Sequence, residues 1–236
     1  MRRFSMPFAV WATLFVTLFC GLVLFAFDYE GPRVDSLGLS SESLAYDTGA
    51  ANLVSAIYLN IRLYDTLLEV LVFSVAVLGV HFYLGPRGVE EQVEGIPESH
   101  VIRTSAGLLL PVIVVLGIHL VLFGHVSPGG GFSGGVVAAS GLLLCAVALG
   151  AEAVGRRFHE TFLERIEWGI LLSILCLACA PLALGRLPLT DVLPQGQVGS
   201  LVSSGSIVLY NVLIGLKVFI GTWVIIHFFM RHRGEI

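Results

Sequence analysis

Residues 106–150 read AGLLLPVIVVLGIHLVLFGHVSPGGGFSGGVVAASGLLLCAVALG, two strongly apolar runs joined by a glycine-rich segment. The runs, Ala106–Phe123 and Phe132–Gly150, are close to the length of about 20 apolar residues that an α-helix needs to cross the hydrocarbon core of a bilayer. Residues 123–135, here called the glycine hairpin, contain six glycines, one proline and a single ionisable side chain, His125. The stretch therefore predicts two membrane-spanning helices that turn back on each other at this hairpin.

The rest of the chain has the same character. Its 236 residues are 56% hydrophobic and only 13% charged, with a mean hydropathy of +0.90, whereas soluble domains are about 25% charged. Because a helix satisfies its own backbone hydrogen bonds, we expect an all-α integral membrane protein with about six transmembrane helices and a short amphipathic helix. Four further apolar runs supply the remaining candidate spans: Met6–Phe27, Leu67–Leu84, Trp168–Leu184 and Ile207–Phe229.

The arginines predict the orientation. With six spans, the N-terminus, residues 85–105, residues 151–167 and the C-terminus share one side of the membrane. Nine arginines fall on that side, and three, Arg33, Arg62 and Arg186, fall on the other. Positive residues favour the cytoplasm, so both termini are expected there, in a multi-pass protein of the cell membrane. No basic patch or aromatic–basic stripe indicates binding to nucleic acid.

The chain divides into two blocks. Residues 1–84 hold two spans, and residues 101–236 hold four, with an acidic, proline-containing linker at 85–100. Within the first block, residues 49–64 place apolar side chains at helical spacing without a membrane-length run. This pattern predicts the short amphipathic helix, either lying at the membrane surface or packed across the bundle.

The glycine hairpin has two interpretations. Pro128 interrupts a helix, and glycine permits backbone angles and close approaches that other residues forbid. After it, Gly131 and Gly135 form a GxxxG pattern that lets a partner helix come very close. The segment is therefore either a tightly packed hairpin around a hydrated site at the outer end, or a hairpin with no role in transport. The candidate interface residues are Pro128, Gly129, Gly130, Gly131, Phe132, Gly134 and Gly135.

Ionisable side chains inside the spans are the candidates for an ion path. Lys217, the only lysine, lies in the middle of the last span, where a charge must face a partner or water; a structural ion pair is the alternative. Asp65 and Glu69 are one helical turn apart and could share a cation or proton, but Thr66-Leu-Leu-Glu69 also fits a capping box. His119 and His125 flank the end of the third span, as proton relays or as hydrogen-bonding residues between helices.

Catalytic chemistry has little support. The CxxC pair Cys176 and Cys179 lies in an apolar run without a second pair or a neighbouring histidine, which favours helix packing over a redox or metal site. No histidine–carboxylate pattern with metal-ligand spacing indicates a bound metal. We therefore expect no catalytic site and no cofactor in this chain.

The segment LVLFGHVSPGGGFSGGVVAASGLLL resembles the B subunit, or MnhB/MrpB domain, of multisubunit Mrp-type sodium/proton antiporters. That family has a span ending near Gly-His, then Pro-Gly-Gly-Gly-Phe and a pair of glycines, and it has four spans. The resemblance covers residues 101–230 approximately. It implies a non-catalytic membrane subunit that works with A- and D-like antiporter subunits and small C-, E-, F- and G-like subunits.

Upstream, TGAANLVSAIYLNIRLYDTLLEVLVFSVAVLG (residues 48–79) resembles the C-terminal part of the large A subunit, also found as an E-type subunit in Mrp-like membrane-bound hydrogenases. The resemblance implies a fusion of two neighbouring subunits, and it supports Glu69 as an ion-handling residue. Asn60 replaces a carboxylate common in that pattern, which weakens cation binding by this stretch alone. The complex would transport Na⁺ or H⁺, either as a pure antiporter or joined to hydrogenase-like redox subunits. The alternative is a purely structural scaffold.

Overall fold

The computed structural model describes residues 40–84, 100–150 and 160–231, together with positions 16, 17, 19–21, 24, 154 and 155. Every regular element in these residues is helical, which confirms the predicted all-helical fold. Five helices are long and apolar enough to cross a membrane, and they correspond to five of the six predicted spans. The first predicted span, Met6–Phe27, lies almost entirely outside the described residues. The long helices are α4 (Leu63–Leu84), α5 (His100–Leu122), α6 (Gly131–Leu149), α8 (Glu160–Ala183) and α9 (Ile207–Arg231).

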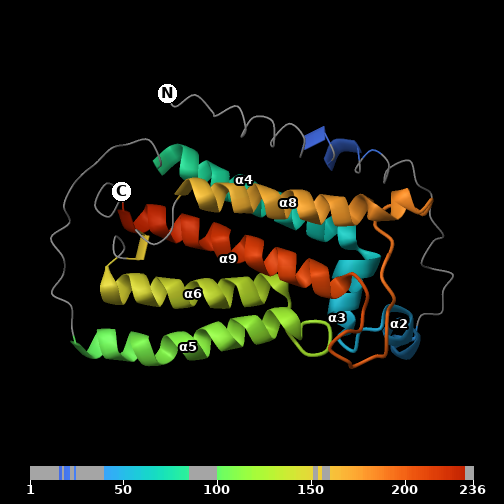
Figure 1. Cartoon of the computed structure of the whole chain (residues 1–236), viewed down its shortest axis with the longest axis horizontal. Coiled ribbons are helices and arrows are strands. Elements are labelled where there is room, and N and C mark those ends of the chain that lie inside the picture. The colour runs from blue at the N-terminus through green and yellow to red at the C-terminus, as the bar shows by residue number, and fades with distance from the viewer. Residues whose placement is uncertain are drawn as a thin grey trace.

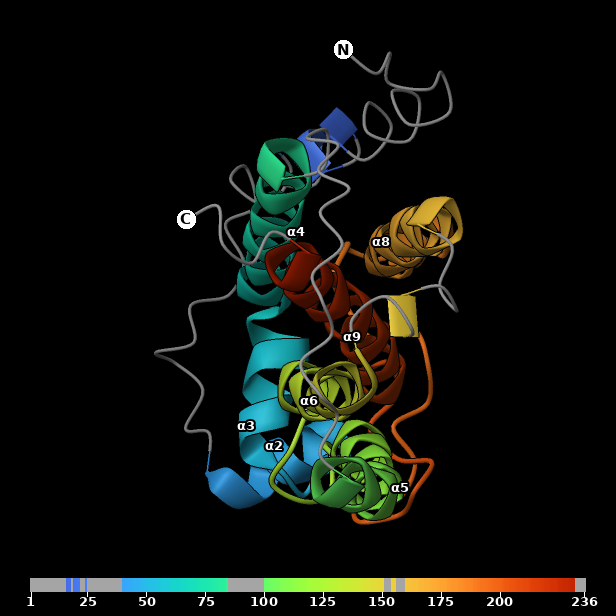
Figure 2. The ribbon, with the colours of Figure 1, turned by 90° about the vertical axis from the view of Figure 1, so that its left-hand side faces the viewer.

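The long helices lie side by side, with α9 at the centre. In Figure 1, α5 and α6 occupy the lower part of the bundle, α9 the middle, and α4 and α8 the upper part. Seen along the bundle in Figure 2, α4 and α8 flank α9 on opposite sides. Helix α9 contacts α4, α5, α6 and α8, so each of the other long helices packs on it. A polar residue on α9 therefore reaches both blocks of the sequence.

Successive long helices alternate in direction. Helices α4, α6 and α9 end, and α5 and α8 begin, at the end of the bundle shown on the left of Figure 1. The glycine hairpin, the loop at residues 184–206 and the short helix α2 (Ser41–Thr48) lie at the other end. We call these the left end and the hairpin end. The alternation matches the predicted order of the loops, whereas the side that faces the cytoplasm remains a prediction.

The predicted amphipathic helix is packed across the bundle. It consists of α3 (Leu53–Ala56) and the π-helical turn η2 (Ile57–Ile61), which run across the hairpin end before α4 begins. Asn52 caps α3 with its side chain, and the wide turn closes through a bond from the Arg62 N–H to the Ile57 carbonyl. Ala56 and Leu59 are buried against the core. The π-turn was not predicted, because its sequence is compatible with an ordinary α-helix.

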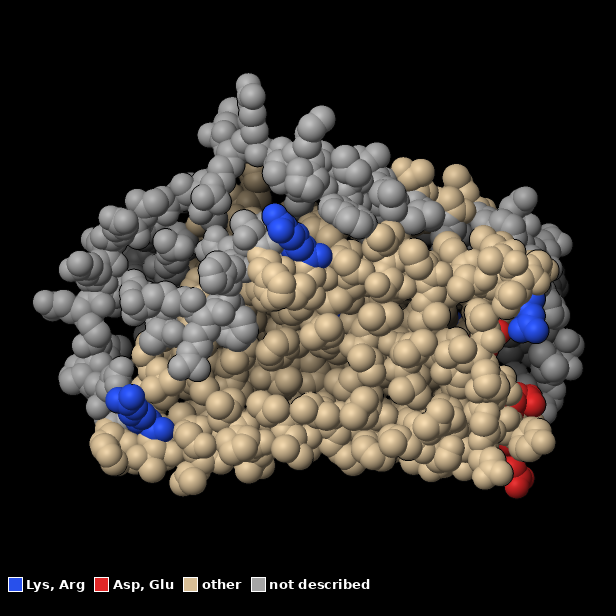
Figure 3. Space-filling view, in the orientation of Figure 1, with Lys and Arg blue, Asp and Glu red and all other residues tan. Residues whose placement is uncertain are grey.

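The outer surface of the bundle suits a lipid or protein environment. On the face shown in Figure 3, uncharged side chains cover most of the described surface, and the visible acidic groups lie at the hairpin end. Large apolar residues are exposed along α4 and α5, among them Val72, Phe82 and Val115. Lipid tails are as apolar as these side chains, so the side chains gain no hydrophobic free energy by moving from lipid to a helix interface. The fold therefore depends on close helix packing and interhelical polar contacts.

Two details of the predicted spans are wrong. Helix α8 begins at Glu160, about two turns before the predicted start at Trp168, because Phe162, Leu163 and Ile166 continue its apolar pattern. In addition, Cys176 faces outwards on α8, so it does not fill a buried packing position, whereas Cys145 is buried.

Candidate functional site

A chain of hydrogen bonds joins the first block of the sequence to the glycine hairpin. The Asn52 amide donates to the carbonyls of Gly124, at 2.7 Å, and Ser127, at 3.0 Å. Ser55 donates to the same Gly124 carbonyl at 2.5 Å and lies 3.2 Å from the Tyr58 hydroxyl. Two side chains, Asn52 at the N-cap of α3 and Ser55 within it, therefore satisfy carbonyls in the turn that follows α5.

The same network continues into α9. The Tyr58 hydroxyl lies 3.3 Å from Oδ1 of Asn211, and the Gly131 N–H donates to that oxygen at 2.9 Å. Asn211 is fully buried. Its amide thus joins the first turn of α6, the amphipathic segment and α9 at a single point. Sequence reasoning missed Asn211, although a polar amide within an apolar span is a recognised signal for a contact between helices.

Glycine is required where the hairpin meets this network. Gly130 has φ +152°, and a Cβ there would overlap the Tyr58 hydroxyl. A Cβ on Gly131 would lie 2.6 Å from the Asn211 carbonyl oxygen, and one on Gly135 would lie 2.6 Å from the Gly215 carbonyl oxygen. The two positions of the GxxxG pattern therefore bring α6 onto α9 at backbone contact distance.

The other hairpin residues take different positions. Gly134 faces α5, where a Cβ would lie 2.8 Å from the Gly117 carbonyl oxygen, and Gly129 lies against Leu120. Phe132 packs on the main core, while Pro128 is exposed at the turn.

His125 is held inside the hairpin end. Its side chain is fully buried, and Nε2 lies 3.1 Å from the Ser200 carbonyl in the loop 184–206. Its own carbonyl accepts a bond from the Asn52 N–H at 2.9 Å. Nδ1 has no hydrogen-bond partner among the described residues. His125 therefore fastens the loop 184–206 to the hairpin through Nε2, while its Nδ1 is buried without a hydrogen-bond partner among the described residues.

The two carboxylates at the start of α4 have different surroundings. Asp65 forms an ion pair with Arg62 on the surface, and Glu69 is exposed one turn further along α4. The predicted capping box is wrong, because α4 begins at Leu63 and the Thr66 hydroxyl donates instead to the Tyr58 carbonyl at 2.6 Å. Burial raises the pKa of Tyr58 above 10; its bond with Ser55 opposes this, and the Glu69 charge adds to it. Tyr58 therefore stays neutral near Glu69.

His119 lies apart from the other candidates. It is exposed on α5 and stacks on Phe123, with ring centroids 4.7 Å apart. The structure therefore brings His125 into the hairpin network and leaves His119 on the outer face of the bundle.

Lys217 forms a buried ion pair, the alternative that the sequence left open, with a partner that the sequence did not identify. Its side chain is 0% exposed, and Nζ lies 2.5 Å from Oε1 of Glu167, whose side chain is 14% exposed. Glu167 comes from α8, at a position that was assigned to a loop before the predicted span. Two signals were available in the sequence. A buried lysine requires a partner of opposite charge, and the apolar residues on either side of Glu167 indicate that the helix extends this far.

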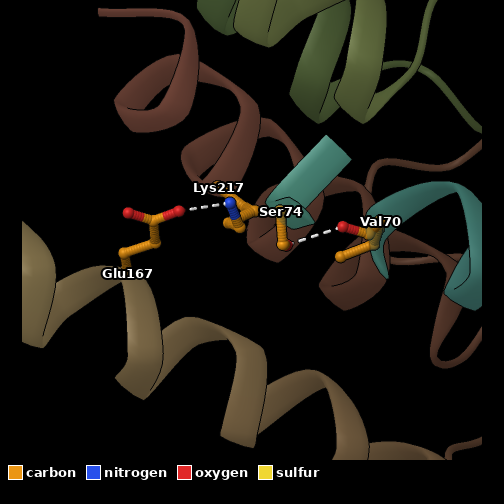
Figure 4. Close-up of polar contacts among 4 residues, drawn as sticks. All are labelled: Val70, Ser74, Glu167 and Lys217. Carbon is orange, nitrogen blue, oxygen red and sulfur yellow. Dashed lines mark hydrogen bonds and ion pairs between the residues drawn. The ribbon is translucent and has the colours of Figure 1, made fainter. Parts of the chain in front are cut away.

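Three helices enclose this pair. Figure 4 shows the Lys217 ammonium group directed at the Glu167 carboxylate, with Ser74 of α4 nearby. The Ser74 hydroxyl donates to the Val70 carbonyl of its own helix at 2.7 Å. The ammonium nitrogen also lies 5.0 Å from the centre of the Phe73 ring, within the range of a cation–π contact. A fully buried positive charge and a mostly buried negative charge thus lie side by side between α4, α8 and α9.

In the described part of the chain, no group of three or more His, Cys, Asp or Glu residues could hold a metal ion.

A family model described as a domain related to the MnhB subunit of Na⁺/H⁺ antiporters matches residues 101–224, more than half of the chain. The chain belongs to this family. The MnhB-related domain therefore contains the hairpin, Glu167, Asn211 and Lys217, whereas Asn52, Ser55 and Tyr58 precede it.

Individual relatives agree with this assignment. An uncharacterized protein of Methanocaldococcus jannaschii is 31% identical over 195 residues, which are 72% of this chain and 73% of that protein. The Na⁺/H⁺ antiporter subunits B of Alkalihalophilus pseudofirmus and Bacillus subtilis are 30% and 31% identical. These matches cover 31% and 32% of this chain and 51% and 52% of those subunits, so the chain spans about half the length of either.

Two solved structures share the fold. A chain of the membrane-bound sulfane sulfur reductase, an archaeal respiratory membrane complex, is 30% identical with a TM-score of 0.68; the match covers 95% of this chain and 99% of that one. A chain of the Mrp complex from Dietzia sp. DQ12-45-1b has a TM-score of 0.62 at 19% identity; the match covers 96% of this chain and 30% of that one. The MnhB-related chain thus has the fold of subunits from multisubunit membrane complexes.

Proposed function

We propose that this chain is a non-catalytic subunit of an Mrp-type membrane complex and forms part of its path for Na⁺ or H⁺. The observation that carries the proposal is the desolvated Lys217–Glu167 pair inside a bundle that belongs to an antiporter-subunit family. Ionisable residues within spans are expensive and usually mark ion or proton pathways. Relatives with the same domain are named as subunits B of Na⁺/H⁺ antiporters, which gives the proposed cargo.

The path begins, in this proposal, at the hairpin end. Asp65 and Glu69 attract cations there, and the polar groups of Tyr58, Asn211 and His125 lie at the same end of the bundle. This end faces the outside of the cell membrane, since the arginine distribution places the left end in the cytoplasm. His119 belongs to the path only where a neighbouring subunit covers the exposed face of α5.

The chain also has the organisation of a fusion. The sequence before residue 85 resembles an A-subunit segment, and the structural match to a chain of the Mrp complex covers 96% of this chain, so it extends beyond the MnhB-related domain. The network from Asn52 to Asn211 gives a physical reason to join the two parts covalently, because neither part satisfies its polar groups without the other. In this proposal, the partners are further A- and D-like antiporter subunits and small C-, E-, F- and G-like subunits.

Transport by the intact complex tests the proposal. Glu69→Gln removes a carboxylate from the start of the path, and Glu42→Gln, in the exposed first turn of α2, is the matched control. Sodium-dependent proton movement is measured in inverted membrane vesicles, with assembly checked by copurification. We expect Glu69→Gln to lower transport at least fivefold and Glu42→Gln to leave it unchanged. Equal transport by both variants would show that the Glu69 carboxylate is not part of the ion path.

A second candidate is a subunit of a redox-driven complex. Its support is the match that covers 99% of a chain in an archaeal respiratory complex at 30% identity. Purification in mild detergent separates the two candidates, because a redox-driven complex copurifies with subunits that contain iron–sulfur clusters or nickel. A stand-alone antiporter yields membrane subunits without those metals.

A further inference from the structure

A cavity of about 220 Å³ lies between α4, α8 and α9. On α4 its lining runs from Leu71 through Ser74 to His81, a rise of about 15 Å along the helix. Glu167 lines it on α8, and His227 lines it on α9. Since α4 and α9 end at the left end of the bundle, the cavity extends from the buried ion pair towards that end.

The cavity has polar groups along its length. Glu167 faces it from the inner part, and its Oε1 is the atom bonded to Lys217. Ser74 lines the same cavity, and the imidazoles of His81 and His227 lie towards the left end, against Phe228 with ring centroids 5.2 and 6.1 Å away. The remaining lining is mostly aliphatic and aromatic.

The ion pair leaves hydrogen-bonding capacity unused. An ammonium group has three donors and a carboxylate has several acceptor sites. Among the described residues, Lys217 donates one bond, to Oε1 of Glu167. The 14% exposure of the Glu167 side chain together with its place in the cavity lining indicates that the carboxylate borders free space. A buried carboxylate is stable there only when further hydrogen bonds solvate it.

We infer that this cavity is a water-filled vestibule that connects the Lys217–Glu167 pair with the aqueous phase at the left end of the bundle. Its ligands are water and hydrated protons, and this rests on the transport role proposed above. One water occupies about 30 Å³ of liquid, so the cavity has room for several. Purely apolar cavities stay dry, but polar groups line this one, among them the Glu167 carboxylate, which borders its free space. Water at Glu167 then replaces the solvation that burial removed.

Cysteine labelling tests the vestibule in the intact complex. Ser74→Cys places a thiol beside the pair, in a background with the four native cysteines replaced by alanine. Ser173→Cys is the matched control, because Ser173 lies in α8, is exposed on the outer face, and donates to its own helix at 2.8 Å as Ser74 does at 2.7 Å. A charged, membrane-impermeant methanethiosulfonate is added to either side of the vesicles. We expect Ser74→Cys to react at least tenfold faster than the control, and from one side.

A plug variant separates the vestibule from other routes. Leu78 lines the cavity one turn beyond Ser74 towards the left end, so Leu78→Trp should reduce labelling of Ser74→Cys at least tenfold. Equal labelling of Ser74→Cys and the control, or labelling that Leu78→Trp leaves unchanged, overturns the inference. Labelling does not measure transport, so a negative labelling result overturns the vestibule and leaves the proposed function standing. A negative transport result would in turn overturn the proposed function without changing the expected labelling.

Discussion

Removing either member of the buried ion pair should destabilise the protein far more than removing both. At 2.5 Å and an effective dielectric constant of about 20, Coulomb's law gives an attraction of roughly 7 kcal/mol between Lys217 and Glu167 before desolvation is subtracted. Desolvation offsets much of this, but a single deletion leaves a buried charge, which costs about 3–5 kcal/mol. We therefore expect Glu167→Leu to lower the thermal midpoint in detergent by on the order of 10 °C.

The two single variants should differ. Lys217 is 0% exposed, so Glu167→Leu leaves a cation that neither solvent nor another described carboxylate can reach. Lys217→Met leaves Glu167, which borders the cavity and can be hydrated there. The smaller loss is thus expected for Lys217→Met. The double variant should return close to the wild-type midpoint, because apolar replacement of a buried pair is often neutral or stabilising.

A double-mutant cycle in the purified complex measures the coupling. The matched control is the Arg62–Asp65 pair, whose side chains are 60% and 30% exposed, and whose coupling should be several-fold smaller because solvent screens it. The reasoning is refuted if both single variants keep the wild-type midpoint, or if the double variant falls by the sum of the two single losses. Either result would mean that the charges do not interact in a desolvated site.

Three further predictions concern the hairpin end. Gly135→Ala should destabilise the complex by about 1–3 kcal/mol, because the added methyl group overpacks the contact with α9. The control Gly107→Ala, at an exposed helical site with open space, should be neutral or stabilising, and thermal melts of the two variants compare their midpoints. Asn211→Leu should cost about 1–3 kcal/mol, because it leaves the buried Gly131 N–H without a partner and removes the acceptor to which the Tyr58 hydroxyl donates; an unchanged midpoint would contradict the network. Since the pKa of Tyr58 is raised in the folded state, its contribution to stability is present below pH 10 and lost as the pH rises further; an alkaline titration of Tyr58→Phe should show a smaller loss than the wild type.

The spans could be predicted because membrane thickness sets a length that apolar runs either reach or miss. Five predicted runs became α4, α5, α6, α8 and α9, with their ends within about two residues of the prediction, but α4, α5 and α8 begin roughly one to two turns earlier than predicted. The early start of α8 hid Glu167, since acidic residues beside an apolar run are usually assigned to a loop. Single-sequence patterns identify a residue in need of a partner, such as Lys217, but they do not say which distant helix provides it.

The glycine hairpin shows the same limit. Its composition indicated close packing, and the structure places Gly131 and Gly135 against α9. The partners of the hairpin could not be derived, because Tyr58 and Asn211 are about 70 and 80 residues away from Gly131 along the chain. The π-turn before α4 was equally hidden, since it depends on the tertiary contacts that hold Tyr58 and Thr66 together.

The central claim is that the buried charges serve ion movement rather than the stability of a scaffold. The Glu167→Leu/Lys217→Met double variant tests it most directly, because it should assemble into a complex of wild-type stability without either charge. Sodium-dependent proton movement in inverted vesicles is measured for this variant and the wild type at equal amounts of assembled complex. We expect transport to fall at least tenfold in the double variant. Wild-type transport by the assembled double variant would contradict it and leave this chain a structural subunit.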